Sequence, residues 1–322
     1  MTLLELKTLL ETKPAKEIFG DDPDAIYRKY AIITHPDKNP DQEELAREIF
    51  KLLSLKKEDL NTKPVTVQSK THTYKVETVI GTGDYSTVHL CSDNIILKVS
   101  NDVATNKKLT NEYETICKLH QASGGDSYSR HFLMPIEHFV VKDNKKMNKA
   151  VISYKTPPNL YTLKKIKERY PNGIDPRDAA WMFNRVLEAL GFIHTYKFVH
   201  GAILPENLLF DVENHNVVII GWTHSVQNSG VIKTISGPYK AHYPKEVFNK
   251  GPATSGVDIF MAAKCMKYIV ANPPPTYDGI LKACLLENPK ARPQDAWELH
   301  NEFNDVLHNL YGKRTFRVFT MS

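Results

Sequence analysis

The chain has 322 residues, of which 41% are hydrophobic and 25% are charged, and its formal net charge is +5. This length is sufficient for two or three domains with a substantial core. The modest charge lacks the clustered basic face of nucleic-acid-binding proteins, and no apolar run is long enough to span a membrane, so neither partner is expected.

The four cysteines lie far apart in the sequence and form no CxxC pair, so they indicate neither a zinc cluster nor a disulfide framework. Free thiols are typical of a reducing compartment, and we therefore expect a cytoplasmic protein. The start of the chain, Met1–Lys7, has an early glutamate and no long apolar core, which predicts a helix and not a signal peptide.

Two helical patterns follow near the N-terminus. The first covers residues 24–33, and the second is amphipathic and runs from Glu43 to Leu53. Pro36 ends the first helix, because proline cannot continue the helical hydrogen-bond pattern. The polar loop between the two helices carries the tripeptide His35-Pro36-Asp37.

Two helices joined by a loop with this tripeptide resemble the J-domain, a module that docks on DnaK-type chaperone ATPases and stimulates them. The resemblance covers residues 14–55, and Glu17–Gly20 falls where the family has its short first helix. The usual basic second helix is reduced to two basic residues. The chaperone-binding residues that the resemblance implies are His35, Pro36, Asp37, Arg28 and Lys29.

The rest of the chain changes character after a polar, proline-punctuated linker at residues 61–73. Strands are expected at Tyr74–Ile80, Thr87–Cys91, Ile95–Val99, Phe132–Val140 and Ala150–Tyr154. Helices are expected at Lys107–Leu119, Ala179–Tyr196, Val257–Val270, Tyr277–Leu286 and Gln294–Leu310. This order predicts an α+β fold: a helical domain at residues 1–60 and a two-lobed domain at 74–322, with lobes of about 74–154 and 155–322.

A glycine-rich stretch, Gly81-Thr82-Gly83-Asp84-Tyr85, lies between the first two expected strands. The third strand carries Lys98 in an apolar run, and the following helix places Glu112 on its apolar stripe. A carboxylate on a buried face needs a cation, and Lys98 is the candidate partner.

Together with Phe198–Phe210 and Val217–Trp222, this order resembles the protein-kinase fold from Tyr74 to Leu310. His200 matches the histidine of the catalytic loop, and Asp258 the buried aspartate that opens the central helix of the second lobe. The resemblance also implies a structural ion pair between Glu246 and Arg292. The nucleotide-binding candidates are Gly81, Gly83, Tyr85, Val88, Lys98, Glu112 and Asn207, with Asn207 as metal ligand at most.

The departures from the kinase pattern concern the chemistry itself. The catalytic aspartate falls on Ala202 and the magnesium-binding aspartate on Gly221, while Leu204 replaces the catalytic-loop lysine. Phosphoryl transfer depends on positioning and on a metal that neutralises phosphate charge, so both supports are removed. Ile96 also stands where the family has a small alanine above the adenine. The resemblance therefore implies a pseudokinase with no catalytic residue, weak ATP binding and no strong magnesium site.

Several neighbouring side chains are expected to be structural or solvated. His200 should bond the backbone at the base of its loop. The acids Glu206, Asp211 and Glu213 and the histidines His194 and His224 are expected to be ordinary solvated or packed residues. The C-terminal segment Lys313–Phe319 alternates basic and aromatic residues, which favours a packed terminal strand over a nucleic-acid contact.

The sequence thus predicts an adaptor in which a J-domain-like module recruits a DnaK-type chaperone and a pseudokinase binds an unknown client or signalling partner. The alternative is a divergent protein kinase, an ATP-dependent Ser/Thr phosphotransferase that uses noncanonical residues. A third interpretation is a scaffold in which the His35-Pro36-Asp37 loop has no chaperone role.

Overall fold

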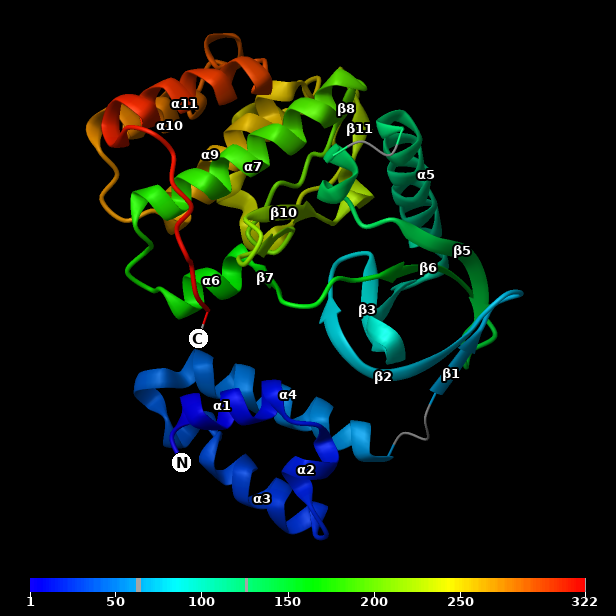
Figure 1. Ribbon diagram of the computed structural model, residues 1–322. Helices are drawn as coiled ribbons and strands as arrows, with labels where there is room; N and C mark the ends of the chain where they lie inside the picture. The colour runs from blue at the N-terminus through cyan, green and yellow to red at the C-terminus, as the bar shows by residue number, and fades with distance from the viewer. Residues whose placement is uncertain (62–64, 125–126, 322) are drawn as a thin grey trace. The chain divides into compact units, whose positions relative to one another are not determined.

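The structure is a computed structural model and describes residues 1–61, 65–124 and 127–321 (Figure 1). The chain forms two compact units: residues 1–67 with 73–78, and residues 68–72 with 79–322. The segment expected as linker contains strand β1 (Val65–Gln68) and the start of β2 (Thr73–Thr82), while its residues 62–64 lie outside the described residues. The domain boundaries at residues 60 and 74 stay predictions.

The described residues of the first unit form the α-helices α1 (Leu3–Thr12), α2 (Ala15–Phe19), α3 (Pro23–Ile33) and α4 (Glu43–Asn61). Helix α1 begins with a capping box, in which the Glu5 N–H donates to Thr2 Oγ1 and the Thr2 N–H donates to Glu5 Oε2. Its apolar face packs on α2 and α4. The buried core of this unit consists of Leu3, Leu6, Leu10, Ile18, Phe19, Ala46, Ile49 and Leu53.

The second unit begins with an antiparallel sheet. Four of its strands are neighbours in the order β3 (Ser86–Cys91), β4 (Ile95–Ser100), β6 (Asn148–Lys155) and β5 (Pro135–Lys142). Helix α5 (Asn106–Ser123) packs against β5 and β6 (Figure 1). The register places Lys98 of β4 opposite Val88 on one side and Ile152 on the other. Strand β5 starts three residues later than expected. Phe132 directly follows the 3₁₀ turn Ser127–His131 and is buried outside the sheet.

The second half of this unit is mainly helical. Its helices are α6 (Leu163–Arg169), α7 (Pro176–Thr195), α8 (Lys245–Phe248), α9 (Ser255–Ile269), α10 (Pro275–Cys284) and α11 (Ala296–Tyr311). Short strands form two small sheets: β10 (Asn216–Ile219), β9 (Leu208–Asp211) and β7 (Leu160–Thr162) in one, and β11 (Val226–Gln227) with β8 (Phe198–Val199) in the other. No described helix combines the length and the apolarity that crossing a bilayer requires.

Helix α7 is the central element of this half, because it packs against both α9 and α11 (Figure 1). Gly191 of α7 allows the close approach of α11. A Cβ at this position would lie 2.5 Å from the indole ring of Trp297, so any larger residue would force the two helices apart.

The C-terminal segment packs as expected, but the expectation of a strand is wrong, since the described residues after α11 form none. Side chains hold the segment instead of a backbone ladder. The ring of Phe316 stacks on His215 with centroids 4.3 Å apart. Arg317 Nε donates to Asp178 Oδ1 at 3.0 Å, and the buried Phe319 lies against Tyr170.

An ion pair between Glu246 and Arg292 joins α8 to the segment before α11, as the kinase resemblance implies. The Arg292 Nη atoms lie 2.5 and 3.2 Å from the two carboxylate oxygens, and one of them also donates to the Glu287 carbonyl. The guanidinium lies 4.7 Å from the ring centroid of Phe260 and is 1% exposed. The arginine is therefore removed from solvent, while the Glu246 side chain is 15% exposed.

Replacing Arg292 with methionine should lower the free energy of unfolding by about 3–5 kcal/mol, because it leaves the Glu246 carboxylate without its cation. Chemical denaturation of the full chain measures this change. Lys245→Met is the matched control, since its pair with Glu287 is exposed and should leave stability unchanged. Equal stability of the two variants would show that the buried pair does not hold the segment.

Candidate functional site

The loop from His200 to Asn207 is held in place by the carboxylate of Asp258, which is fully buried at the start of α9. Asp258 Oδ2 accepts the His200 N–H at 2.7 Å, and Oδ1 accepts the Gly201 N–H at 2.8 Å. His194 Nε2 lies 3.0 Å from Oδ2. His194 therefore also contacts this carboxylate. The sequence analysis placed His194 on the helix before the loop but did not predict this contact.

The side chain of His200 bonds the backbone, as expected. Its Nδ1 accepts the Ala202 N–H at 3.2 Å, so Nε2 carries the proton and donates to the Ile220 carbonyl at 3.1 Å. Burial lowers the pKa of His200 to about 4, and the imidazole is therefore neutral at pH 7. The ring of Trp222 packs against it edge to face.

Of the two positions where the kinase pattern has metal ligands, Gly221 has no side chain and Asn207 keeps one candidate ligand, its amide oxygen. Asn207 Nδ2 donates to the Ala202 carbonyl at 2.9 Å, and Gly221 lies against the Asn207 amide. Gly221 has φ +83°, and a Cβ there would lie 2.6 Å from Asn207 Oδ1, so no carboxylate can be placed at this position without a shift. No group of three or more histidine, cysteine or acidic side chains in the described ranges could hold a metal ion.

The Lys98–Glu112 pair is intact. Lys98 Nζ lies 2.8 and 2.6 Å from the two Glu112 carboxylate oxygens, and Glu112 is buried. Tyr154 completes the cluster, because its hydroxyl donates to Glu112 Oε1 at 3.0 Å. Burial, together with the Glu112 charge, raises the pKa of Tyr154 well above its usual value. The sequence analysis missed Tyr154, although strand alternation places it on the same face as Ile152, the partner of Lys98.

The glycine-rich stretch forms a closed turn beside this cluster. The Gly83 N–H donates to the Ser86 carbonyl at 2.9 Å, and Asn101 Nδ2 donates to the Gly83 carbonyl at 2.8 Å. The ring of Tyr85 lies 5.3 Å from the ring of His224. Gly81 lies in β2, and Val88 lies opposite Lys98. Their roles in nucleotide binding stay predictions.

The neighbouring acids Glu206 and Asp211 have other partners. Glu206 pairs with Lys164 at 3.0 Å on the surface. Asp211 accepts the backbone N–H groups of Glu213 and Asn214, so it closes its own turn.

The J-domain-like loop of the first unit exposes its charged side chains. Asp37 and His35 are exposed, and the Asp37 N–H donates to His35 Nδ1 at 3.2 Å. Asn39 Nδ2 fixes the loop to α3 by donating to the carbonyls of Ile33 and His35. Arg28 and Lys29 are also exposed on α3. The side chain of Pro36 lies outside the described residues.

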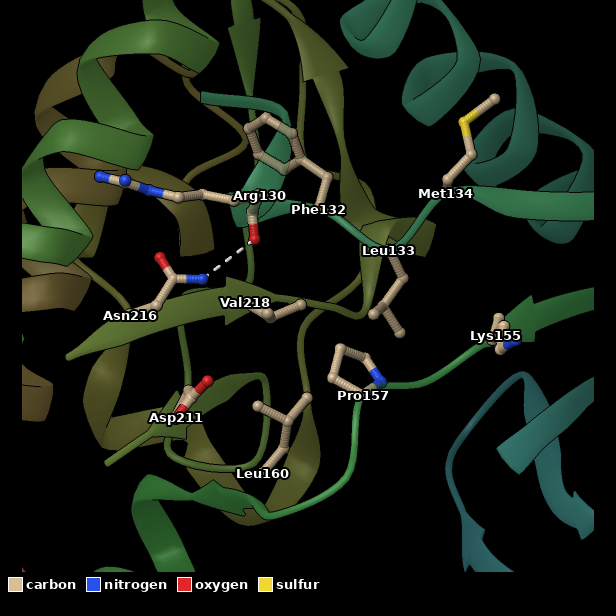
Figure 2. Close-up of a pocket in the computed structure, with 10 residues that line it drawn as sticks. All are labelled: Arg130, Phe132, Leu133, Met134, Lys155, Pro157, Leu160, Asp211, Asn216 and Val218. Carbon is tan, nitrogen blue, oxygen red and sulfur yellow. Dashed lines mark hydrogen bonds between the residues drawn. The ribbon is translucent and has the colours of Figure 1, made fainter. Parts of the chain in front are cut away.

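A separate hollow of about 300 Å³ lies beside the β7–β9–β10 sheet. Figure 2 shows Leu133, Pro157, Leu160 and Val218 around it, while the Arg130 carbonyl accepts a hydrogen bond from Asn216 Nδ2 at its edge. None of the predicted nucleotide-binding residues lines this hollow, so it is distinct from the Lys98 cluster.

Comparison with known proteins points to kinases. The chain is 27% identical to calcium/calmodulin-dependent protein kinase type 1 of Caenorhabditis briggsae over 240 residues, 69% of this chain and 61% of that kinase. It is 26% identical to the serine/threonine-protein kinase stk11 homolog of Dictyostelium discoideum over 154 residues, 44% of this chain and 24% of that protein. The structure of vaccinia related kinase 3 superposes with a TM-score of 0.59 at 14% identity, covering 77% of this chain and 91% of that one. No protein-family model matches.

These similarities show that the chain has a protein-kinase-like fold. The chain spans about three-fifths of the length of the calmodulin-dependent kinase that it matches. The comparisons give no support for the J-domain, so the J-domain resemblance and its chaperone-binding residues stay predictions. The pseudokinase assignment also stays a prediction.

Replacing Gly221 with alanine should destabilise the protein by about 1–3 kcal/mol, because a non-glycine residue at φ +83° is strained and its Cβ meets the Asn207 amide. Thermal or chemical unfolding measures the loss. Gly279→Ala is the control, since this helical glycine faces open space and should gain about 0.5–1 kcal/mol. A Gly221→Ala variant as stable as wild type would show that the site can accept a side chain.

Proposed function

We propose that this protein is a divergent protein kinase in which nucleotide binding through Lys98 is kept and magnesium-dependent phosphotransfer is reduced or lost. The observation that carries the proposal is the Lys98–Glu112 pair beside the glycine-rich stretch. The kinases found by comparison support this interpretation better than the co-chaperone interpretation.

The geometry of Lys98 supports phosphate binding. Its ammonium group has three donors, of which Glu112 accepts two, so a third N–H can reach a phosphate oxygen. The Lys98 side chain is 13% exposed and Glu112 only 3%, which leaves the cation on the accessible side of the pair. A lysine held in this way loses little conformational freedom when an anion binds.

The composition of the catalytic loop argues against efficient transfer. Ala202 provides no general base, a group whose contribution is typically about 10²–10⁴ in rate. Gly221 provides no metal ligand, and Asn207 provides at most its amide oxygen, because its Nδ2 donates to the Ala202 carbonyl. The attacking hydroxyl would have no proton acceptor, and the metal that neutralises the phosphate would have at most one side-chain ligand.

Titration of the full chain with ATP should detect binding that is weak and gains nothing from magnesium. Lys98→Met should weaken this binding about tenfold, because a charge-assisted hydrogen bond is lost. Lys142→Met, an exposed lysine at the end of β5 in the same sheet, should bind like wild type.

Two results would contradict the proposal. Undetectable ATP binding would remove the nucleotide function. Tight magnesium-dependent binding, accompanied by phosphate transfer to a protein substrate, would instead favour a fully active noncanonical kinase.

A second candidate function concerns the first unit alone. The side chains of His35 and Asp37 are exposed, and a polar loop anchored by Asn39 suits docking to a DnaK-type chaperone. In this interpretation the kinase-like unit binds the client. The support is limited to the loop and its resemblance to the J-domain.

If the loop docks, the full chain should accelerate ATP hydrolysis by a DnaK-type chaperone from the same cell. His35→Gln and Asp37→Asn should abolish the acceleration, because both side chains are exposed and available for contact. Asp41→Asn, an exposed aspartate in the same loop, serves as control. No stimulation by wild type, or equal stimulation by all variants, would leave the loop without a chaperone role.

A further inference from the structure

Lys108 is a cation of the candidate site that the kinase resemblance does not assign. It lies on α5 one turn before Glu112, so both side chains project from the same face of the helix. Its Nζ lies 5.4 Å from the ring centroid of Tyr85 in the glycine-rich stretch. Lys108 is half-buried, and it has no ion-pair partner in the ranges that the structure describes.

A histidine contacts the same tyrosine, and a second lysine acts on Lys108. Tyr85 also contacts His224, which is part of the turn Trp222–His224 that packs against α5. Burial lowers the pKa of Lys108, and the nearby Lys233 charge lowers it further. Burial likewise lowers the pKa of His224, and the charges of Lys108 and Lys98 act in the same direction. Both pKa values are thus lowered first by burial and then by neighbouring positive charge.

The acids near these cations are few. Glu112 is already engaged by Lys98 and Tyr154. The negative charge of Asp84 acts to raise the pKa of His224, which shows that Asp84 lies near this histidine. Asp84 forms no ion pair with Lys108. A desolvated lysine without a carboxylate partner is costly to keep charged, and a bound anion would relieve that cost.

We propose that Lys108 and Lys98 together bind the phosphate groups of the ligand directly, so that Lys108 takes the place of the magnesium ion. This inference rests on the proposed nucleotide function and names the form of its ligand: a metal-free polyphosphate. A nucleoside triphosphate and inorganic tripolyphosphate share this chemistry. Because Gly221 offers no metal ligand and Asn207 at most its amide oxygen, the protein holds a magnesium ion poorly, and such an ion on the phosphates would cancel negative charge that the two lysines attract.

Calorimetric titration of the full chain with ATP and with inorganic tripolyphosphate, each in EDTA and in excess magnesium, tests the proposal. Both probes should bind in EDTA, and magnesium should weaken both. Lys108→Gln should weaken binding in EDTA about tenfold. Lys108→Arg should retain most of the affinity, because it keeps the charge. Lys107→Gln, the exposed neighbour on α5, should bind like wild type.

The outcomes separate this inference from the proposed function. Tripolyphosphate binding that depends on Lys108, without ATP binding, would support the anion site and contradict the nucleotide function. ATP binding that is equal in wild type and Lys108→Gln, or stronger in magnesium, would keep the nucleotide function and overturn the role of Lys108. Binding of neither probe would overturn both.

Discussion

The conformation of the candidate site depends on one buried carboxylate, that of Asp258. A fully buried charge is tolerated only when its oxygens are hydrogen-bonded, and here the backbone N–H groups of His200 and Gly201 supply those bonds. These contacts are charge-assisted and short, so they restrict the loop to one arrangement. The loop in turn places Ala202 and Asn207 beside Gly221, which decides what the site can bind.

The residues that stabilise the kinase-like fold are different from the residues that phosphotransfer needs. The Lys98–Glu112 and Glu246–Arg292 pairs each satisfy charges that burial would otherwise penalise. The fold does not need a carboxylate at Ala202 or Gly221. Position 221 favours glycine, because its φ is positive and a Cβ would meet the Asn207 amide. A fold of this type can therefore be stable although two residues that phosphotransfer normally needs are absent.

In the proposed function, the absence of carboxylates at Ala202 and Gly221 changes the electrostatics of the site as well as its chemistry. In a kinase, the carboxylates hold metal ions and the metal ions neutralise phosphate. Here Lys108 and His224 both lie against Tyr85 of the glycine-rich stretch, and Lys98 lies opposite Val88 on the next strand. The same phosphate charge can then be met by ammonium groups, which bind as point charges and need no octahedral coordination.

Local patterns in the sequence determined most of the elements and one essential contact. Periodicity indicated α5, α7 and α9, and a glutamate on the apolar stripe of α5 required Lys98 as its partner. The tertiary structure alone decided that Tyr154 bonds Glu112 and that Lys108 and His224 meet at Tyr85. It also decided that side chains, and not a strand, hold the C-terminal segment. These contacts join residues far apart in the chain, and helical or strand periodicity reports only which face of an element is buried, not which distant side chain lies against it.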